Sequence, residues 1–298
     1  MKVAVTGSSG LIGSALVPHL RSVGHEVIRL VRRAPSAPDE ITWDPAVGTV
    51  DLDALAGIDA VVHLAGAGVG DHRWTDDYKQ VILNSRVDGT RTIANAMTAL
   101  DPRPRVLVSA SAIGFYGDTG DRVIDETSPP GHGFLASVVR AWEAAAEAAR
   151  TAGIRVVHPR SGLVVSGNGG AWQRMFPLFK LGVGGRLGSG SQYWSWISLR
   201  DEVCALQFLL EQEHLSGPVN LTGPAPVTNS EVTKAMGHVL GRPTILPVPA
   251  FALKAVLGEF SSEVLGSARV LPAVLESAGF VFQDQTIDSA IRTAVDVG

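Results

Sequence analysis

Three glycines near the start of the chain limit its fold more than any other feature. A short apolar run over residues 2–6 leads directly into Gly7, Gly10 and Gly13, and a helical pattern follows. With this spacing the first glycine permits a tight strand-to-helix turn, the second leaves room for a bound group, and the third lets the helix pack closely on the sheet. A second strand pattern follows at 26–31, so the segment predicts a βαβ unit whose turn binds a diphosphate at the helix N-terminus.

The residues expected to contact this diphosphate belong to the turn and to the first helical turn. They are Gly7, Ser9, Gly10, Leu11, Ile12 and Gly13. The alternative is a glycine-rich turn that holds no ligand, but the strand before it and the helix after it are both those that a dinucleotide site requires.

The order of the remaining patterns predicts an α/β fold, a Rossmann-type doubly wound parallel sheet with a smaller C-terminal substrate lobe. A hydrophobic share of 45% over 298 residues suits such a buried sheet. Strands are expected at Lys2–Thr6, Glu26–Val31, Ala60–Leu64, Arg105–Ser109 and Arg155–Pro159, with a shorter one ending near Trp43. Helices are expected at Leu11–Ser22, Asp76–Leu100, Leu135–Thr151 and Asp201–Gln212, and another starts at 228 or 229.

The composition and the strand–helix alternation of the sequence change after residue 160. Residues 166–196 are rich in glycine and tryptophan and alternate less regularly. We therefore expect a dinucleotide-binding domain over 1–160 and a substrate lobe over 161–298, with segments near 198–225 returning to the main sheet.

Charge and cysteine content limit the partners. The net charge is -4 and no basic stripe is present, which argues against nucleic acid. Cys204 is the only cysteine, so no internal disulfide can form, and no cluster has zinc-ligand spacing; a reducing, cytoplasmic setting is expected. The apolar stretch Leu246–Leu257 is too short for a membrane span and contains two prolines and a lysine, so no membrane partner is expected.

The end of the second strand indicates which dinucleotide is bound. NAD-binding sites usually carry an acidic residue there, whereas this chain has Arg32 and Arg33. Guanidinium groups suit a 2′-phosphate through charge-assisted hydrogen bonds. The pair therefore predicts NADP(H), against the alternative of a solvated basic loop.

Further motifs resemble those of the extended short-chain dehydrogenase/reductase family. They are HLAG at 63–66, VDGT at 87–90, SAS at 109–111 with YG at 116–117, and WISLRD at 196–201. The sequence most closely resembles an atypical epimerase-like subgroup of that family. Its members are often labelled sugar nucleotide epimerases or cell-division inhibitors. Its motifs here are ITWDP at 41–45, SRV at 85–87, FLA at 134–136 with WE at 142–143, RSG at 160–162, LPVP at 246–249 and GF at 279–280.

The resemblance implies further cofactor contacts. They lie at strand ends and on one helix: Trp43, Asp44, Leu64, Ala65, Gly66, Arg86, Arg160, Gly162 and Val164. Core packing is the alternative for Trp43, and pairing with an acid such as Asp88 is the alternative for Arg86. Many members pair through two helices, here those expected over 76–100 and 135–151, which leaves a homodimer open.

The substrate is expected beneath the loop 182–196, where flexible glycines alternate with aromatic and polar side chains. The candidates for binding it are Gln192, Trp196 and Arg186. The alternative is a surface loop fixed by its tryptophans.

The catalytic pair of the family is missing. None of the three tyrosines is followed four positions later by lysine, so no Tyr-x-x-x-Lys pair exists to move a proton. Ser111, Ser109 and Tyr116 are the remaining candidates. Two interpretations follow: an NADP(H)-dependent oxidoreductase or epimerase with altered acid–base groups, or an NADP(H)-binding regulatory or sensor protein without turnover.

Overall fold

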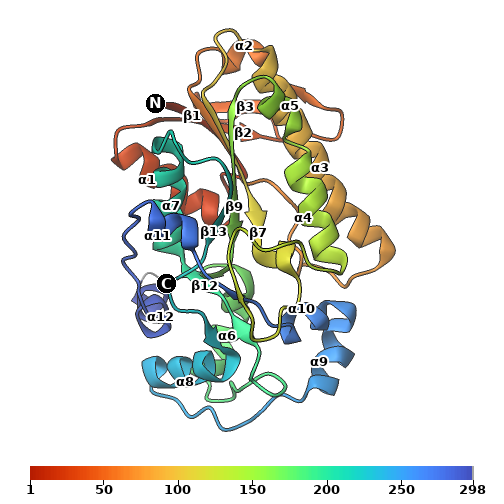
Figure 1. Ribbon diagram of the computed structural model, residues 1–298, viewed down its shortest axis with the longest axis vertical. Coiled ribbons are helices and arrows are strands. Elements are labelled where there is room, and N and C mark those ends of the chain that lie inside the picture. Colours follow the sequence, from red (N-terminus) through yellow and green to blue (C-terminus); the bar gives the residue numbers. More distant parts are fainter. Residues whose placement is uncertain (297–298) are drawn as a thin grey trace.

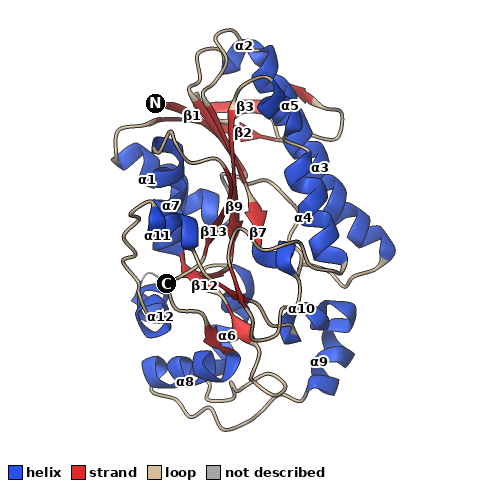
Figure 2. Ribbon diagram, in the orientation of Figure 1, coloured by secondary structure: helices blue, strands red, loops and turns tan. Residues whose placement is uncertain are grey.

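A central β-sheet lies between two layers of helices in the computed structural model, which describes residues 1–296, and a smaller lobe lies at one end (Figure 1). Figure 2 shows the strands running between helices on either side, with the smaller lobe at the lower end. No helix within residues 1–296 is long and apolar enough to cross a membrane. The predicted α/β fold class is confirmed.

The first βαβ unit has the predicted bounds: β1 Lys2–Thr6, α1 Leu11–Ser22 and β2 Glu26–Val31. Four of the five β1 residues are buried, as expected of a central parallel strand covered on both faces. Leu16 and Leu20 lie one turn apart on α1 and pack against the sheet. Local patterning therefore fixes this unit.

The strands of the main sheet run in the order β13-β9-β6-β5-β1-β2-β3-β4, and β7 pairs with β9. Their bounds are β3 Glu40–Asp44, β4 Thr49–Val50, β5 Ala60–His63, β6 Val106–Ser109, β7 Ser111–Ala112, β9 Arg155–Ser161 and β13 Gly217–Leu221. Of the strand pairs that the structure describes in this sheet, only β3–β4 is antiparallel. The strand order reverses between β1 and β5, and in such sheets ligands bind beyond the carboxyl ends of the strands at that point.

Helices cover both faces of this sheet (Figure 1). On one face lie α1, α7 (Leu199–Glu211) and α11 (Ala273–Ser277), which share a core with the sheet. On the other lie α3 (Asp76–Ala99) and α5 (Glu147–Thr151), beside α4 (Phe134–Ala144), and α2 (Leu52–Leu55) closes the upper end. This layering leaves the carboxyl ends of the strands facing the smaller lobe.

The other predicted elements lie within two residues of the observed bounds at each end, and two differences have a visible structural cause. The helix predicted over 135–151 is two helices, α4 and α5. Where they meet, the Ala145 amide is shared between acceptors four and three residues back, and the Ala146 amide bonds only three residues back. Strand β9 continues two residues past Pro159, since its pairing with β6 ends at Val157 and resumes with β7 at Arg160. Proline is therefore tolerated at the gap between the two partners.

The smaller lobe contains two short sheets and several helices. Its elements are β10 Leu163–Val165, α6 Gly170–Lys180, β11 Tyr193–Trp194, β12 Trp196–Ser198, β14 Val227–Thr228, α8 Asn229–Leu240, α9 Ala250–Leu257, α10 Ser261–Leu265 and α12 Ile287–Asp296. Helix α8 begins at Asn229, as predicted, and Thr228 and Glu231 form a capping box there. Two segments return to the larger part: β13 pairs with β9, and β15 (Arg269–Val270) pairs with β8 (Val123–Ile124).

Candidate functional site

The first and third glycines of the turn after β1 have no room for a side chain. Gly7 has a φ of +65°, and a Cβ added there would lie 2.8 Å from the carbonyl carbon of Leu64. A Cβ on Gly13 would overlap the carbonyl oxygen of Gly7, and one on Gly10 would lie 3.3 Å from that oxygen. Glycine is therefore required at the first and third positions, as the spacing predicts.

Main-chain amides at the start of α1 are available to a ligand. Gly10 is the N-cap and offers no side-chain acceptor, and no acidic residue lies in the first turn. Within residues 1–296, the amides of Leu11, Ile12 and Gly13 have no acceptor, whereas that of Ser14 bonds to Gly10. Three free N–H groups at the positive end of a helix dipole form a site suited to an anion.

The residues that follow β5 adjoin this turn. They are Leu64, Ala65 and Gly66, which are predicted cofactor contacts. Thr6 and His63 are register partners, and the Thr6 hydroxyl oxygen accepts from the amides of Leu64 and Ala65 at 3.1 and 3.2 Å. That hydroxyl therefore donates to Nδ1 of His63, 2.8 Å away. The bonds hold Leu64, Ala65 and Gly66 beside the glycine turn, with Gly66 exposed.

His63 and Trp43 belong to the core. Burial lowers the pKa of His63 to about 3, so its ring is neutral, and the Trp43 ring meets it edge-on at 5.9 Å. Trp43 is buried beneath α3, so the structure favours the alternative of core packing over the expected cofactor contact. Asp44 is exposed and accepts from the amide of Ala46.

The two arginines after β2 are not equivalent. Arg33 forms two hydrogen bonds to Glu40, at 2.6 and 2.8 Å, and this arginine lowers the pKa of Glu40 to about 2. Arg32 is exposed and has no side-chain partner among the described residues. The expectation of two free guanidinium groups is therefore corrected to one, because Glu40 occupies the other.

Arg86 on α3 is a largely buried cation. Its Nη1 donates to the carbonyls of Ala67 and Ile82 at 2.9 and 3.1 Å, and its guanidinium lies 5.0 Å from the Trp142 ring. Burial lowers its pKa to about 10. Asp88 pairs with Arg91 instead, so the alternative of an Arg86–Asp88 pair is wrong.

Arg86 lies beside Gly66, one of the predicted cofactor contacts. A Cβ on Gly66 would lie 3.4 Å from its side chain, and no described carboxylate pairs with it. A cation that is desolvated without a carboxylate is expected to favour an anionic ligand.

A buried ion pair lies below the ends of β7 and β9. Arg160 is 3% exposed and donates from Nε and Nη2 to the two oxygens of Glu143 at 2.8 and 2.9 Å. Oε1 of Glu143 also accepts from the Ser111 hydroxyl at 2.6 Å. Burial acts to raise the pKa of Glu143, but Arg160 outweighs it and keeps that pKa below its ordinary value.

This pair corrects the expected role of Arg160, because its guanidinium is engaged by protein groups. It also lies 3.5 Å from the Phe115 ring centroid. The partner Glu143 was not singled out as functional from the sequence, although it is the only acidic residue in α4. A single acid on a mostly apolar helix is the signal that could have identified it.

Tyr116 belongs to the same buried network. It ends the short 3₁₀ helix η1 (Ile113–Tyr116) and is 2% exposed. Its hydroxyl donates to Asn220 at 2.8 Å and accepts from Arg160 at 2.9 Å, and burial raises its pKa. A phenol that is buried and fully bonded cannot exchange protons with a substrate, so the structure gives Tyr116 a packing role instead of the expected catalytic one.

The two serines at the ends of β6 and β7 differ. Ser109 is fully buried, and its hydroxyl has no partner among the described groups. Ser111 is held by Glu143, as described above. A hydroxyl that donates to a carboxylate keeps two lone pairs free to accept a further hydrogen bond. Ser111 is also buried, at 4% exposed, but of the three expected catalytic residues it alone combines a carboxylate partner with free lone pairs.

The residues after β9 pack closely against β12. A Cβ on Gly162 would lie 2.5 Å from the Ser195 carbonyl oxygen, and the Gly162 amide donates to Leu221 at 2.9 Å. Val164 lies in β10 and pairs with Ile197. The Gly162 amide is therefore already bonded within the protein and is not free for the expected cofactor contact.

A buried carboxyl that the sequence did not predict lies behind this segment. Glu202 on α7 is 1% exposed, and its Oε1 accepts from the Ser161 hydroxyl at 2.6 Å. Burial raises its pKa to about 7, and its second oxygen has no partner within the described residues. Glu202 is therefore titratable near neutral pH.

The residues expected to line a substrate pocket are mostly in the core. Trp196 is 1% exposed and donates to the Ala225 carbonyl at 3.0 Å, and Gln192 is buried and donates to Leu187 at the same distance. Arg186 is exposed and donates to the Ser189 carbonyl. The expectation for Gln192 and Trp196 is corrected, because both fix the loop to the smaller lobe.

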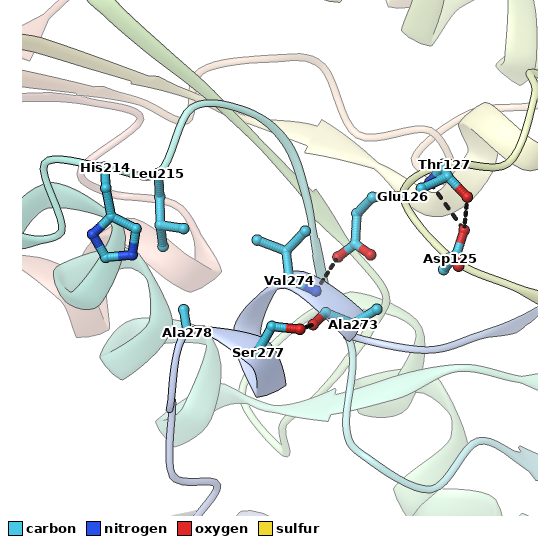
Figure 3. A pocket seen from close by; sticks show the side chains of 9 residues that line it. All are labelled: Asp125, Glu126, Thr127, His214, Leu215, Ala273, Val274, Ser277 and Ala278. Carbon is cyan, nitrogen blue, oxygen red and sulfur yellow. Dashed lines mark hydrogen bonds between the residues drawn. The ribbon is translucent and has the colours of Figure 1, made fainter.

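A surface cavity of about 380 Å³ lies elsewhere, at the β13 edge of the sheet (Figure 3). Figure 3 shows Glu126 directed toward the Val274 amide; its carboxylate also accepts from the amide of Asn220. His214 lies at the other end of the view. None of its lining residues comes from the glycine turn, so this cavity is separate from the dinucleotide region.

Comparison with known proteins agrees with this geometry. Residues 3–221 match the family described as NAD dependent epimerase/dehydratase family, and residues 248–294 match a domain of unknown function, DUF1731. Epimerase family protein Mb2239 of Mycobacterium bovis is 50% identical over 293 residues, which are 98% of this chain and 97% of that protein. The mouse epimerase family protein SDR39U1 is 35% identical, over 99% of this chain and 100% of that protein.

A solved structure of human epimerase family protein SDR39U1 with NADPH has a TM-score of 0.91 and 32% identity, and covers 99% of both chains. The nucleoside-diphosphate sugar epimerase of Corynebacterium glutamicum has a TM-score of 0.81 and 37% identity, covering 98% of this chain and 57% of that one. The chain therefore belongs to the NAD-dependent epimerase/dehydratase family, within the atypical extended short-chain dehydrogenase/reductase subgroup of epimerase-like proteins.

Proposed function

We propose that this protein binds NADP(H) at the glycine turn and is an oxidoreductase or epimerase acting on a small-molecule substrate. The observation that carries the proposal is the set of three unbonded amides at the start of α1, over a turn whose first and third glycines exclude side chains. The NADPH in the similar human SDR39U1 structure supports the choice of cofactor.

The chain's own residues fit the dinucleotide. The amides of Leu11, Ile12 and Gly13 suit the diphosphate, because aligned peptide dipoles stabilise negative charge there. Arg32 follows the strand next to β1 and is the free cation for the 2′-phosphate. Arg86 lies beside Gly66 and supplies a second, desolvated positive charge along the path.

NADP(H), when bound, supplies or accepts the hydride. Ser111 would then orient the reacting oxygen: its proton is directed at Glu143, so its lone pairs remain free to accept from a substrate hydroxyl. The negative charge that Arg160 maintains on Glu143 keeps the serine in this orientation. The arrangement favours an alcohol, or the alcohol form of an epimerisation substrate. A carbonyl substrate is less suited, because its oxygen requires a hydrogen-bond donor.

One observation favours the second candidate function, a protein that binds NADP(H) and regulates without turnover. The only tyrosine near Ser111 that the sequence offered, Tyr116, is fully bonded in the core. A site without a phenol and lysine lacks the groups with which the family usually transfers a proton.

The two functions are separated by one experiment. The oxidised cofactor, NADP, is supplied with a panel of alcohols and nucleotide sugars, and NADPH is supplied with ketones and aldehydes. The absorbance of the reduced nicotinamide is followed, and sugar products are analysed for inversion. Turnover that Ser111→Ala lowers supports the enzyme; tight NADPH binding without turnover over the whole panel supports the regulatory protein.

A further inference from the structure

Exposed apolar side chains are concentrated at the lower end of the smaller lobe. Of the thirteen large apolar side chains that are exposed among the described residues, seven come from two segments, 170–188 and 241–258. We call this set the apolar end surface: Leu178, Leu181, Val183, Ile245, Leu246, Phe251 and Val256. Monomeric proteins rarely leave such a group uncovered unless it contacts a partner.

The two segments lie side by side. A Cβ on Gly182 would lie 3.7 Å from Pro243, one on Gly185 would overlap the carbonyl of Leu246, and Leu187 forms a bridge with Val248. Figure 1 shows the chain between α8 and α9 running along the lower end of the molecule, remote from β1 to β3. The apolar side chains therefore belong to one end of the protein.

The helix α9 contributes most directly to this surface. None of its eight residues is buried, and its sequence, AFALKAVL, has Lys254 as its only charged residue. Phe251 and Val256 are each 76% exposed. An apolar helix with a basic residue that remains uncovered is typical of a segment lying at a membrane interface.

The charges within the two segments all have one sign. Of the acidic residues that follow α9, Glu259 pairs with Lys79 and Glu263 is half-buried. Segments 170–188 and 241–258 contain no Asp or Glu, although the whole chain has a net charge of -4. Their five cations are Arg174, Lys180, Arg186, Arg242 and Lys254. Arg174 pairs with Asp71 at 3.8 Å, and within residues 1–296 the other four have no acidic partner. A basic rim around apolar side chains is complementary to an anionic lipid surface, and a protein partner would need a matching acidic rim.

We propose that this end of the protein docks reversibly on an anionic membrane surface, with the apolar end surface entering the headgroup region and the four free cations contacting lipid phosphates. The contact is peripheral, because α9 is too short to span. The sequence predicts no membrane partner because Leu246–Leu257 is too short to span a membrane. A peripheral contact needs no spanning segment. It is independent of the proposed cofactor site, which lies on the larger part.

Vesicle co-sedimentation of the full chain tests the proposal. Vesicles of phosphatidylcholine with phosphatidylserine are compared with pure phosphatidylcholine, at low and high salt. Binding is expected only to the anionic vesicles and should weaken with salt, because screening shortens the reach of the charges. Neutralising one cation, in Lys254→Gln or Lys180→Gln, should lower the partition coefficient about fivefold.

Matched variants control for folding and charge. Val256→Glu is paired with Val281→Glu, since Val256 and Val281 are 76% and 78% exposed and the second lies outside the apolar end surface. Arg140→Gln, an exposed cation on α4, is paired with the lysine variants. Val256→Glu should abolish vesicle binding while Val281→Glu and Arg140→Gln leave it unchanged, with NADPH binding intact in all.

Three results would overturn the proposal. The first is no binding to anionic vesicles, and the second is equal binding to neutral ones. The third is a dimer in sedimentation that Val256→Glu dissociates without any vesicle binding by the parent chain, which would assign this surface to a second copy.

Discussion

The Ser111 hydroxyl donates at 2.6 Å to Oε1 of Glu143, the same oxygen that accepts from Nε of Arg160 at 2.8 Å. The buried cation thus sets the charge of the carboxylate, and the carboxylate sets the direction of the serine proton. Under the proposed function, this arrangement would orient the substrate oxygen in a chain that lacks the Tyr-x-x-x-Lys pair of its family.

Glu143→Gln should destabilise the protein strongly. The variant leaves the Arg160 guanidinium buried without a counter-charge, and breaking a buried pair in this way costs roughly 3–5 kcal/mol. Urea unfolding measures the free energy of unfolding. Glu147→Gln, on the exposed side of α5, is the control and should change it by less than about 0.5 kcal/mol. Equal effects of the two variants would contradict the assigned role of Glu143.

Ser111→Ala should lower turnover without altering NADPH affinity. We propose that the hydroxyl contacts the substrate and not the diphosphate, so its removal should weaken only the orientation of the reacting oxygen. A fall in kcat of about tenfold or more is expected. Steady-state kinetics and NADPH titration on one preparation separate the two quantities; a parallel loss of NADPH affinity would instead place Ser111 at the cofactor.

Gly13→Ala should abolish dinucleotide binding. The added methyl group would overlap the Gly7 carbonyl, so the turn must open and the α1 amides lose their alignment. Ser14→Ala, one position along the same helix, is exposed and should keep binding. Fluorescence titration with NADPH compares the two. Normal NADPH affinity in Gly13→Ala would show that the diphosphate lies elsewhere.

Arg32→Gln should remove the preference for NADPH over NADH. Losing a charge-assisted hydrogen bond costs about 1.5–3 kcal/mol, equivalent to roughly tenfold to a hundredfold in affinity for NADPH. Arg33→Gln should change the preference less, since Arg33 is engaged by Glu40. Competition titrations give the ratio of dissociation constants, and an unchanged ratio in Arg32→Gln would contradict the assignment.

Glu202→Gln should stabilise the protein above neutral pH. Burial raises the pKa of Glu202 from 4.5 to about 7, so the folded chain holds a proton that the unfolded chain releases, and stability falls as pH rises through that range. The amide cannot ionise, so the variant should gain on the order of 3 kcal/mol above pH 7 relative to the parent.

The free energies of unfolding of the parent and of Glu202→Gln should be measured by urea unfolding across the pH range. Below pH 4.5 the carboxyl is protonated in both states, so the variant and the parent should then differ little. Glu213→Gln, at an exposed glutamate, controls for the change in net charge. A difference that does not grow with pH would show that Glu202 ionises freely in the fold.

Local patterns predict the first βαβ unit to the residue, because a strand alternation, a glycine turn and an apolar helix stripe are all encoded within 31 positions. The break between α4 and α5 could not be predicted in this way. It contains no glycine or proline, and Ala146 is simply buried where the two helices meet the sheet. The packing of distant elements decides it.

The candidate site, like the fold, could be predicted only where the determining contacts are local in the sequence. Gly7 and Gly13 could be identified because the steric demand lies in the turn itself. Arg160 looked like a ligand contact because it follows a strand, but its partner Glu143 reaches it only through the fold. Trp196 and Gln192 have the chemistry of a pocket wall, and burial in the smaller lobe uses that chemistry for packing instead.

The central claim is that the glycine turn binds NADP(H), and calorimetric titration of the purified chain with NADPH and NADH tests it most directly. The account predicts one NADPH site per chain, with NADH bound at least about tenfold more weakly. Absence of heat with either dinucleotide, or equal affinity for the two, would contradict it.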